Sequence, residues 1–267
     1  MTNSARIITE GAWNWANAIN TIMLREIRCR FAGDPLGYLW TFLVPVLWIG
    51  TLMFFFSLLG RRPAIPVDTS VFIATGVVPY VLFRYTISSM TRVASTHRHL
   101  VHFANVRVSD LLFAAALLEL INALIIFAVI FALITLLDQM PEVDDPLQTV
   151  HGILLTAVFA ASVGRFAAIA GMVSETAKRM VPVILRPMFW ISGIFFIAPE
   201  LPSKILPFLD WNPLLHAIET TRDGVFLDYS SSFADDWVPL TVSAAFLLAS
   251  YVLQTAARRG SDRIELT

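Results

Sequence analysis

The stretch RFAGDPLGYLWTFLVPVLWIGTLMFFFSLLG, residues Arg30 to Gly60, starts with charged and polar residues and then becomes entirely uncharged. From Leu36 onward it is long enough for a helix that crosses a membrane, which needs roughly 20 mostly apolar residues. We place this first crossing at Leu39–Leu59. Five later stretches have a similar length and apolar character: Val71–Met90, Leu111–Leu137, Leu147–Met172, Met180–Ala198 and Val238–Ala257.

The composition of the chain is that of a membrane protein. The 267 residues are 57% hydrophobic and 15% charged, whereas a soluble domain is about 45–50% apolar and about 25% charged. The apolar runs do not alternate as barrel strands would, and lipid satisfies no backbone polar group, so each run should be helical. The sequence therefore predicts an all-α membrane protein with six transmembrane helices. Its single cysteine, Cys29, excludes an internal disulfide framework.

The distribution of lysine and arginine predicts the orientation of the chain. The segments on the side of the two termini hold 12 of these residues (4, 3, 2 and 3), and the opposite side holds 4. Positive residues favour the cytoplasmic side, so both termini should be cytoplasmic. The N-terminal residues lack the pattern of a cleaved secretory signal, so the first span should direct insertion. The predicted organisation is a cytoplasmic segment 1–37, a six-span domain 38–257 and a cytoplasmic tail 258–267.

The N-terminal segment Ala12–Phe31 is predicted to be an amphipathic helix. Apolar residues such as Ile19 and Met23 recur at helical spacing, and Arg25 and Arg28 fall on the opposite face. Such a basic amphipathic helix should lie in the cytoplasmic interface of the membrane. The alternative is an ordinary amphipathic helix in a small soluble cap.

A second short helix is predicted between the fifth and sixth spans. Asn212 is a suitable N-cap, Pro213 a suitable first helical residue and Gly224 a suitable stop. About eleven residues are too few to cross the membrane. The helix should therefore be interfacial or re-entrant on the outer side.

The loop Thr91–Asp110 contains three histidines but no complete metal-ligand set. No carboxylate or cysteine nearby would complete a site with His97, His99 and His102. The loop is either a solvated basic segment or a short helix from about Thr91 to Phe103 that faces a cytoplasmic partner.

Motifs for chemistry within this chain are missing. The sequence has no G-x-x-x-x-G-K-[ST] phosphate-binding loop and no H-E-x-x-H metalloprotease motif. Ser162-Val163-Gly164 is a poor match to a protease nucleophile. Proton-coupled carriers usually carry several buried acids, but only Glu119 lies well inside a predicted span.

Arginines and aromatic residues are the informative side chains of the predicted spans. A cation in the bilayer is costly, so Arg84, Arg165 and Arg186 should face a cavity, a partner helix or the interface. Each is either a structural ion pair or a contact for an anionic substrate. Aromatic residues cluster in the first, second and fifth spans, where they would suit a membrane-interface belt or stacking on sugar rings: Tyr38, Trp40, Trp48, Phe83, Tyr85, Phe189, Trp190, Phe195 and Phe196.

Three stretches resemble the permease subunits of type-2 ABC exporters. They are LREIRCRFAGDPLGYLW (Leu24–Trp40), HRHLVHFANVRVSDLL (His97–Leu112) and WNPLLHAIETTRDGVF (Trp211–Phe226). Within that group they look most like capsule polysaccharide export permeases of the KpsM/Wzm kind. The resemblance extends from about Trp13 to Arg259.

This resemblance implies a transport subunit without a nucleotide site of its own. It implies a homodimer with two cytoplasmic ABC ATPases that bind ATP and Mg, together with periplasmic and outer-membrane export components and no nucleic acid. The location would be the bacterial inner membrane. The cargo would be a lipid-linked, acidic capsular polysaccharide threaded outward between the two copies.

The resemblance also implies roles for individual residues. The first, second and fifth spans would line the substrate path with Arg84, Arg165, Arg186, Trp40, Trp48, Tyr85, Phe189 and Trp190. The loop after the second span would dock on the ATPase through Val93, His97, Leu100 and Phe103, with a minor contact at Val173–Met180. The re-entrant outer helices would include Asn212, Pro213, His216 and Glu219.

Other functions remain open at this point. The same scaffold could export O-antigen, teichoic acid or a small amphiphile or drug. Proteins of other classes would be a membrane-embedded enzyme of glycan metabolism, which would act without nucleotide, or an ion-coupled carrier, which would need no ATPase.

Overall fold

All regular secondary structure in the described part of the chain is helical. The computed structural model describes residues 3–30, 36–60, 62–63, 65, 67–96, 107–136 and 143–264, and these contain no strand. Five helices in these ranges are long and apolar enough to cross a membrane: α2 (Trp40–Leu58), α3 (Thr69–Thr96), α4 (Val108–Leu136), α5 (Pro146–Val173) and α9 (Trp237–Ile264).

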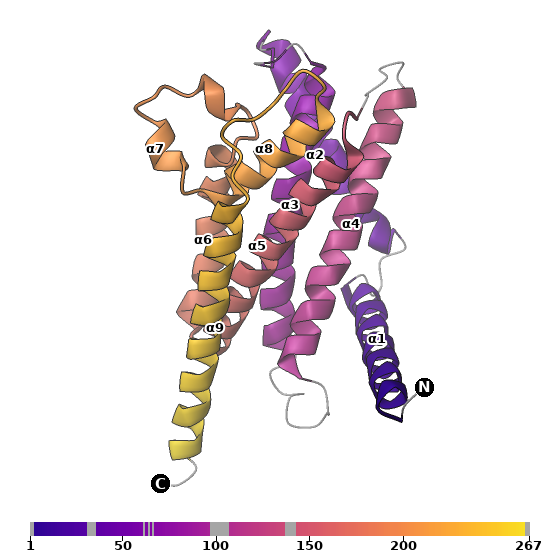
Figure 1. Cartoon of the computed structure of the whole chain (residues 1–267), viewed down its shortest axis with the longest axis vertical. Helices are drawn as coiled ribbons and strands as arrows, with labels where there is room; N and C mark the ends of the chain where they lie inside the picture. Colours follow the sequence, from indigo (N-terminus) through magenta and orange to yellow (C-terminus); the bar gives the residue numbers. More distant parts are fainter. Residues whose placement is uncertain are drawn as a thin grey trace.

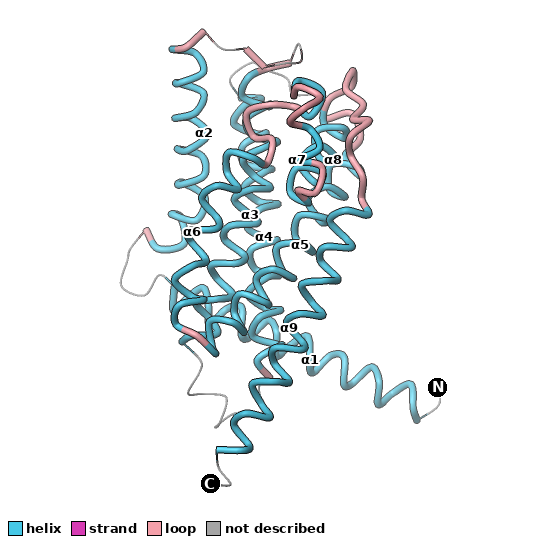
Figure 2. Tube along the Cα trace, turned by 90° about the vertical axis from the view of Figure 1, so that its left-hand side faces the viewer, coloured by secondary structure: helices cyan, strands magenta, loops and turns pink. Residues whose placement is uncertain are grey.

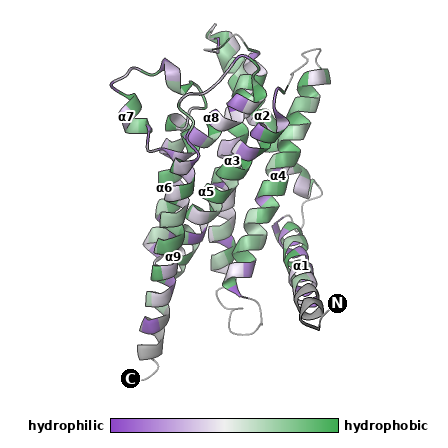
Figure 3. Cartoon of the chain, viewed as in Figure 1, coloured by the Kyte–Doolittle hydropathy of each residue, from purple (hydrophilic) through white to green (hydrophobic). Residues whose placement is uncertain are grey.

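The hydropathy of the bundle matches a membrane environment. Figure 3 shows hydrophobic residues along the middle of the long helices, with hydrophilic residues gathered towards the two ends. The helix α4 has the most apolar window of the five, and α9 is the least buried within the chain. Their exposed apolar faces suit contact with lipid, because hydrophobic side chains can be exposed to lipid without a free-energy cost.

The fifth predicted span, Met180–Ala198, is wrong in its bounds. The helix α6 covers Glu175–Ile191, and its 17 residues give a length of about 26 Å at 1.5 Å per residue, short of the roughly 30 Å hydrocarbon core. The helix ends at Ile191 with Ser192 as its C-cap, because Gly193 follows with a φ of 81°, the left-handed conformation in which helices commonly stop. The apolar residues 194–198 that lengthened the prediction lie in a non-helical segment and a short 3₁₀ turn, Ala198–Glu200.

Although short, α6 carries the chain along the bundle. Figure 1 shows that it leads from the end where α5 stops to the end where α7 (Leu206–Leu209) and α8 (Pro213–Val225) lie. The end of α9 and the helix α1 (Asn3–Arg30) both lie at the opposite end of the bundle. Both ends of the described chain therefore lie at the same end of the bundle.

The helix α1 lies outside the bundle. It contains the predicted segment Ala12–Phe31 up to Arg30 and begins earlier, and Figure 2 shows it leaving the lower end of the bundle sideways. The ring of Trp15 packs on Phe113 of α4 at 5.3 Å between centroids, and its Nε1 donates to Asp110 at 3.4 Å. Trp13 and Trp15 are largely exposed, which is the arrangement expected of an interfacial helix.

The centre of the bundle is α3, which packs on α4 and α5. Most of its residues between Ser70 and Ala94 are buried. The helix continues to Thr96, so the first six residues of the helix predicted from about Thr91 are helical, but they form the end of α3. The rest of that prediction, including His97, Leu100 and Phe103, lies outside the described residues.

The helix α8, which the sequence predicts on the outer side, is enclosed by protein rather than lying on a surface. Twelve of its 13 residues are buried, and it packs on α3 and α5. The prediction that Gly224 stops this helix is wrong, because the helix continues to Val225. Gly224 has a packing role instead, since a Cβ there would lie 2.4 Å from the backbone N of Thr149 at the start of α5.

This close approach predicts a clear stability difference between two glycine substitutions. Gly224→Ala should force α8 and α5 apart, and overpacking of this kind costs about 1–3 kcal/mol. Gly50→Ala in α2 meets nothing within 4 Å in the described structure, so it should be neutral or slightly stabilising. Thermal unfolding of the two variants in detergent measures the difference, and equal midpoints would contradict the packing argument.

Candidate functional site

An aromatic cluster joins α2, α3 and α6. Trp48 of α2 stacks on Phe189 of α6 with ring centroids 5.0 Å apart. Tyr80 of α3 lies 5.1 Å from Phe189 and 6.0 Å from Trp48. Its hydroxyl donates to the backbone carbonyl of Leu185 at 3.0 Å, which fixes α6 on α3. These three helices are the ones that the resemblance assigns to a substrate path.

The cluster continues past the C-terminal end of α6. Phe195 contacts Phe189 at 5.2 Å and Trp190 at 5.4 Å between ring centroids, and it stacks on Phe56 of α2 at 6.1 Å. Trp190 itself is 66% exposed. A ladder of aromatic rings therefore runs beside α6, and one large ring of it faces away from the chain.

Three arginines on α3 and α6 are exposed although they lie within helices of the bundle. On α3 the exposed residues Arg84, Ser88 and Arg92 recur every fourth position and form one stripe. On α6, Arg186 and Trp190 are also exposed and lie four residues apart. Residues at this spacing share one face of a helix. We call Arg84, Ser88, Arg92, Arg186 and Trp190 the cationic face.

Arg165 is not part of this face. It lies on α5, where its Nε donates to Ser250 Oγ at 3.2 Å and its Nη2 donates to Gln254 Oε1 at 3.0 Å. Both partners belong to α9. Of the two roles left open by the sequence, these contacts favour the structural one.

A charged cluster lies where α1 meets the bundle. Arg30 of α1 donates to Glu119 of α4 at 2.6 Å and to Ser89 of α3 at 2.8 Å. Arg92 of α3 donates to Glu26 of α1 at 3.0 Å. The carboxylate of Glu119 is 2% exposed, so the one acid well inside a predicted span has a cation beside it. A lone buried acid in a span indicates that a cationic partner is needed, but the sequence alone did not identify Arg30 as the partner of Glu119.

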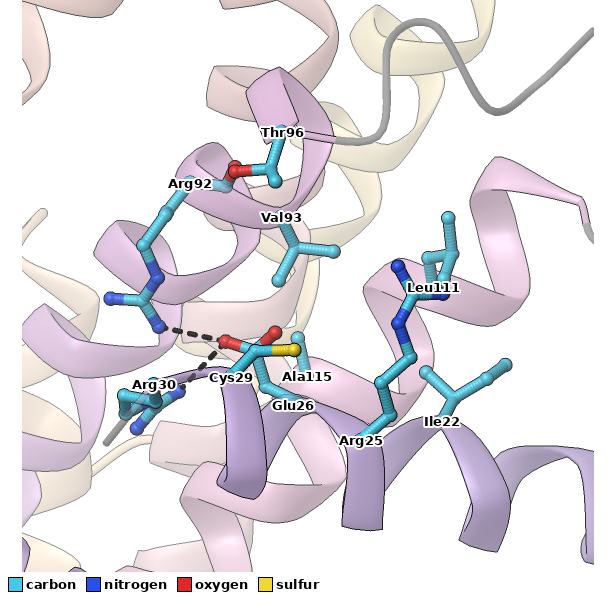
Figure 4. Close-up of a pocket in the computed structure, with 10 residues that line it drawn as sticks. All are labelled: Ile22, Arg25, Glu26, Cys29, Arg30, Arg92, Val93, Thr96, Leu111 and Ala115. Carbon is cyan, nitrogen blue, oxygen red and sulfur yellow. Dashed lines mark hydrogen bonds and ion pairs between the residues drawn. The ribbon is translucent and has the colours of Figure 1, made fainter. Parts of the chain in front are cut away.

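Two pockets lie on either side of this charged cluster, and both are lined by Arg30 and Arg92. The smaller, about 210 Å³, includes Trp40 and Tyr85, two of the residues expected in a substrate path, together with Ser88 and other polar residues: Thr41, Ser89 and Glu119. The larger, about 280 Å³, lies between α1, α3 and α4 (Figure 4).

The residues predicted for the outer helices are held by a dense hydrogen-bond network. Asn212 caps α8 by accepting from the Leu214 N–H at 3.1 Å, and its Nδ2 donates to the carbonyl of Ile191 at 2.9 Å. His216 Nδ1 accepts from the Asp235 N–H at 3.2 Å. Its Nε2 therefore carries the proton, which it donates to the Asp210 carbonyl at 2.7 Å. The prediction of Asn212 as N-cap and Pro213 as first residue is confirmed.

Sequence reasoning missed the buried ion pair within α8. Arg222 is one of the four positive residues that the sequence assigns to the side opposite the termini, but it is fully buried, and its Nη1 lies 3.6 Å from Glu219 Oε1. Its guanidinium donates to the carbonyls of Phe196 and Ile194 at 2.8 and 3.2 Å, and it lies 4.2 Å above the ring of Phe72. Spacing of three residues on a helix is compatible with such a pair, but the same spacing is common on surfaces.

Glu219 is satisfied by further donors. It accepts from the Ala198 N–H at 3.2 Å, from Ser231 Oγ at 2.8 Å and from the hydroxyl of Tyr229. Burial lowers the pKa of Arg222, and the nearby Glu219 carboxylate opposes that shift. Burial, followed by the same carboxylate, raises the pKa of Tyr229. The tyrosine therefore stays protonated and remains a donor.

The predicted docking residues of the cytoplasmic loop are only partly described. Val93 is 3% exposed and packs against α4 in a cluster with Leu111 and Leu112. The other three residues of that prediction, His97, Leu100 and Phe103, lie outside the described ranges. Among the described residues no group of three or more His, Cys, Asp or Glu side chains could hold a metal.

Comparison with known proteins identifies the family to which the chain belongs. The family described as ABC-2 type transporter matches residues 17–226. The chain is 26% identical over 249 residues to the polysialic acid transport protein KpsM of Escherichia coli, covering 93% of this chain and 95% of that protein. Capsule polysaccharide export inner-membrane proteins CtrC of Neisseria meningitidis and BexB of Haemophilus influenzae are each 24% identical over 244 residues, covering 91% of this chain and 92% of theirs. The chain therefore belongs to the ABC-2 type transporter family.

Proposed function

We propose that this chain is the inner-membrane permease of an ABC exporter that moves a capsular polysaccharide outward. The family is one of transport components, which distinguishes it from the enzyme considered above. The relatives named for polysialic acid transport and capsule polysaccharide export match more than nine tenths of the chain. The observation that carries the proposal is the cationic face, because an acidic polymer needs cations along its path.

The cationic face supports a homodimer of six-span subunits. Arginines exposed within the membrane cannot face hydrocarbon, because each would cost several kcal/mol there. A second copy that apposes its own α3 and α6 would enclose both faces around a polar path. In this arrangement α6 is the fifth span, and residues 192–198 complete its passage to the outer side.

The path would combine charge with stacking surfaces. Arg84 and Arg186 would attract carboxylates of the polymer, and the exposed ring of Trp190 would stack on sugar rings. The smaller pocket beside Trp40 and Tyr85 would be the cytoplasmic entry of this path. Contacts that are exposed and distributed suit a polymer that must slide rather than bind in one place.

Energy would come from a separate ATPase. Two copies of a cytoplasmic ABC ATPase would bind ATP and Mg, and they would dock on the loop that follows α3, at His97, Leu100 and Phe103. Because α3 is the most buried long helix, a displacement of its cytoplasmic end would reach the centre of the bundle. Periplasmic and outer-membrane components would continue the export.

The proposal is tested by expressing the chain with an ATPase from a capsule gene cluster in a host that makes the polymer but lacks its permease. We expect polymer on the cell surface only when the permease and an active ATPase are both present, and co-purification of the two chains. Accumulation of polymer inside the cell in every case would overturn the proposal. Export of O-antigen or of a drug instead would keep the scaffold and change the cargo.

The cationic face gives a graded prediction in the same assay. Arg84→Gln and Arg186→Gln should each slow export of an acidic polymer more than export of a neutral one, because only the acidic polymer uses the charge. Arg165→Gln, which loses contacts to Ser250 and Gln254, should slow both polymers alike. Arg259→Gln at the exposed end of α9 is the control. Equal slowing of both polymers by all three variants would assign Arg84 and Arg186 to structure.

A further inference from the structure

Two residues of α4 contact both ends of the connection between α1 and α2. Arg30, the last residue of α1, donates to Glu119 at 2.6 Å. Tyr38 lies in the 3₁₀ turn Gly37–Leu39, directly before α2, and its hydroxyl donates to Asn122 Oδ1. Glu119 and Asn122 lie three residues apart on α4, so they share one face of that helix. We call Arg30, Tyr38, Glu119 and Asn122 the clasp.

The carboxylate of Glu119 fixes the direction of the hydrogen bonds in the clasp. A carboxylate only accepts, so the side chain of Asn122 turns its Nδ2 towards Glu119 Oε2, at 3.3 Å. The amide oxygen of Asn122 then faces Tyr38 and accepts from its hydroxyl. Glu119 and Asn122 are 2% and 1% exposed, so a hydrogen bond lost at either of them is not replaced by water at little cost. The four residues therefore form one directed chain of donors and acceptors.

The clasp lies where the chain changes direction. The helix α1 leaves the bundle sideways, whereas α2 runs along it (Figure 2). Packing within the chain fixes α2 only weakly, because 22% of the apolar window within Gly37–Leu58 is buried. The ring of Tyr38 packs edge-on against Phe42, one turn into α2, with centroids 5.2 Å apart. The bond from Tyr38 to Asn122 therefore fixes the start of α2 on α4.

The clasp also lies against the smaller pocket. Arg30 and Glu119 line that pocket, and so does Trp40, the first residue of α2. Tyr38 precedes Trp40 by two residues, so the contact between Tyr38 and Asn122 sets where Trp40 stands in the pocket wall. Asn122 does not line the pocket, so any effect of Asn122 on the pocket passes through its neighbours.

We propose that Asn122 is a positioning residue for export, which fixes the start of α2 through Tyr38 and thereby holds Trp40 in the pocket wall. The role in export rests on the proposed function, in which the smaller pocket is the entry of the path. The fixing of α2 does not rest on it. Loss of the Asn122 amide should loosen the turn before α2 while the rest of the bundle stays folded.

Hydrogen exchange of the full-length protein in nanodiscs, followed by mass spectrometry, tests the fixing of α2. The amides of Leu39 and Trp40 report on the turn, because they donate to carbonyls within residues 36–38. We expect Asn122→Leu and Tyr38→Phe each to speed exchange of this turn about fivefold, the effect of one lost hydrogen bond. Tyr38→Phe keeps the ring that packs on Phe42. Exchange in α9 should stay at the wild-type rate.

The variant that carries both substitutions tests whether the two side chains act through one contact. Residues that act through a shared contact are not additive, so exchange in the double variant should be about as fast as in either single variant. Thr135→Val is the matched control on α4, because the Thr135 side chain is exposed and donates to the Phe131 carbonyl of its own helix. This variant should exchange as the wild type does.

The export assay described above tests the consequence for transport. At equal amounts of folded permease, Asn122→Leu and Tyr38→Phe should each export several-fold less polymer than the wild type, and Thr135→Val should export the same amount. Export at the wild-type level by variants whose turn exchanges faster would overturn the positioning role.

Three exchange results would also overturn the proposal. Unchanged exchange of the turn in both single variants would show that Asn122 does not fix the start of α2. Acceleration in the double variant equal to the product of the two single effects would show that the side chains act independently. Faster exchange throughout the chain, α9 included, would assign Asn122 to the stability of the whole bundle. If the wild type itself exports no polymer, the proposed function and the role in export fail together, whereas the exchange rates still decide whether Asn122 fixes α2.

Discussion

Replacing Glu219 by alanine should remove almost all correctly folded protein from the membrane. The substitution leaves Arg222 fully buried without its carboxylate partner, and it deprives Tyr229, Ser231 and the Ala198 N–H of their acceptor. Breaking a buried ion pair by removing one partner costs about 3–5 kcal/mol. The yield of monodisperse protein in detergent measures the loss. Asp228→Ala, an exposed acid on the same outer segment, is the control and should behave as the wild type.

A double variant separates the cost of the unpaired charge from other effects. Glu219→Gln with Arg222→Met replaces both charges and keeps similar side-chain volume. Replacement of a whole buried pair is often neutral, whereas loss of one member is not. We expect this variant to recover much of the yield lost in Glu219→Ala. If the double variant is as unstable as the single one, the network stabilises the fold through its hydrogen bonds and not through charge balance.

Apolar composition predicted the helices that meet lipid. The run Leu39–Leu59 became α2, Trp40–Leu58, and Leu147–Met172 became α5, Pro146–Val173. In each case polar or turn residues flank a predominantly apolar stretch, so the local sequence contains the information. Hydropathy identifies such helices because the bilayer imposes a length on them.

The same criterion failed for α6 because that helix is not bounded by hydropathy. Its charged residues extend it towards Glu175, and Gly193 ends it inside an apolar run. Hydropathy alone does not reveal the left-handed conformation of Gly193, and it does not show that the buried residues after Gly193 are non-helical. The end of α6 depends on tertiary packing that brings residues 192–198 against α8.

The sequence predicted which types of residue would form the candidate site, but it did not predict which residues they would contact. Cations and aromatic rings in spans signalled function, and the structure places Arg84, Arg186 and Trp190 on exposed faces. The same reasoning could not tell that Arg165 would meet α9, or that Arg222 would be buried. Both contacts join elements that only the folded bundle brings together.

The ion pair between Arg30 and Glu119 should be asymmetric in its response to substitution. Glu119 is 2% exposed in the middle of α4, whereas Arg30 ends α1 and is 14% exposed. Arg30→Gln leaves the Glu119 carboxylate buried without its cation, and removal of one partner of a buried ion pair is strongly destabilising. Glu119→Gln leaves an arginine that can turn towards water and keeps Glu26 3.6 Å away. Arg30→Gln should therefore lower both folded yield and export more than Glu119→Gln.

The double variant Arg30→Gln with Glu119→Gln separates folding from coupling. Without a buried charge the folded yield should return close to that of the wild type, but α1 loses its ionic link to α4. If α1 must move with the bundle during transport, export should stay low while yield recovers. Arg28→Gln, exposed on α1, is the control for a lost charge. Recovery of export together with yield would show that the pair serves only stability, and that Glu26 with Arg92 suffices to hold α1.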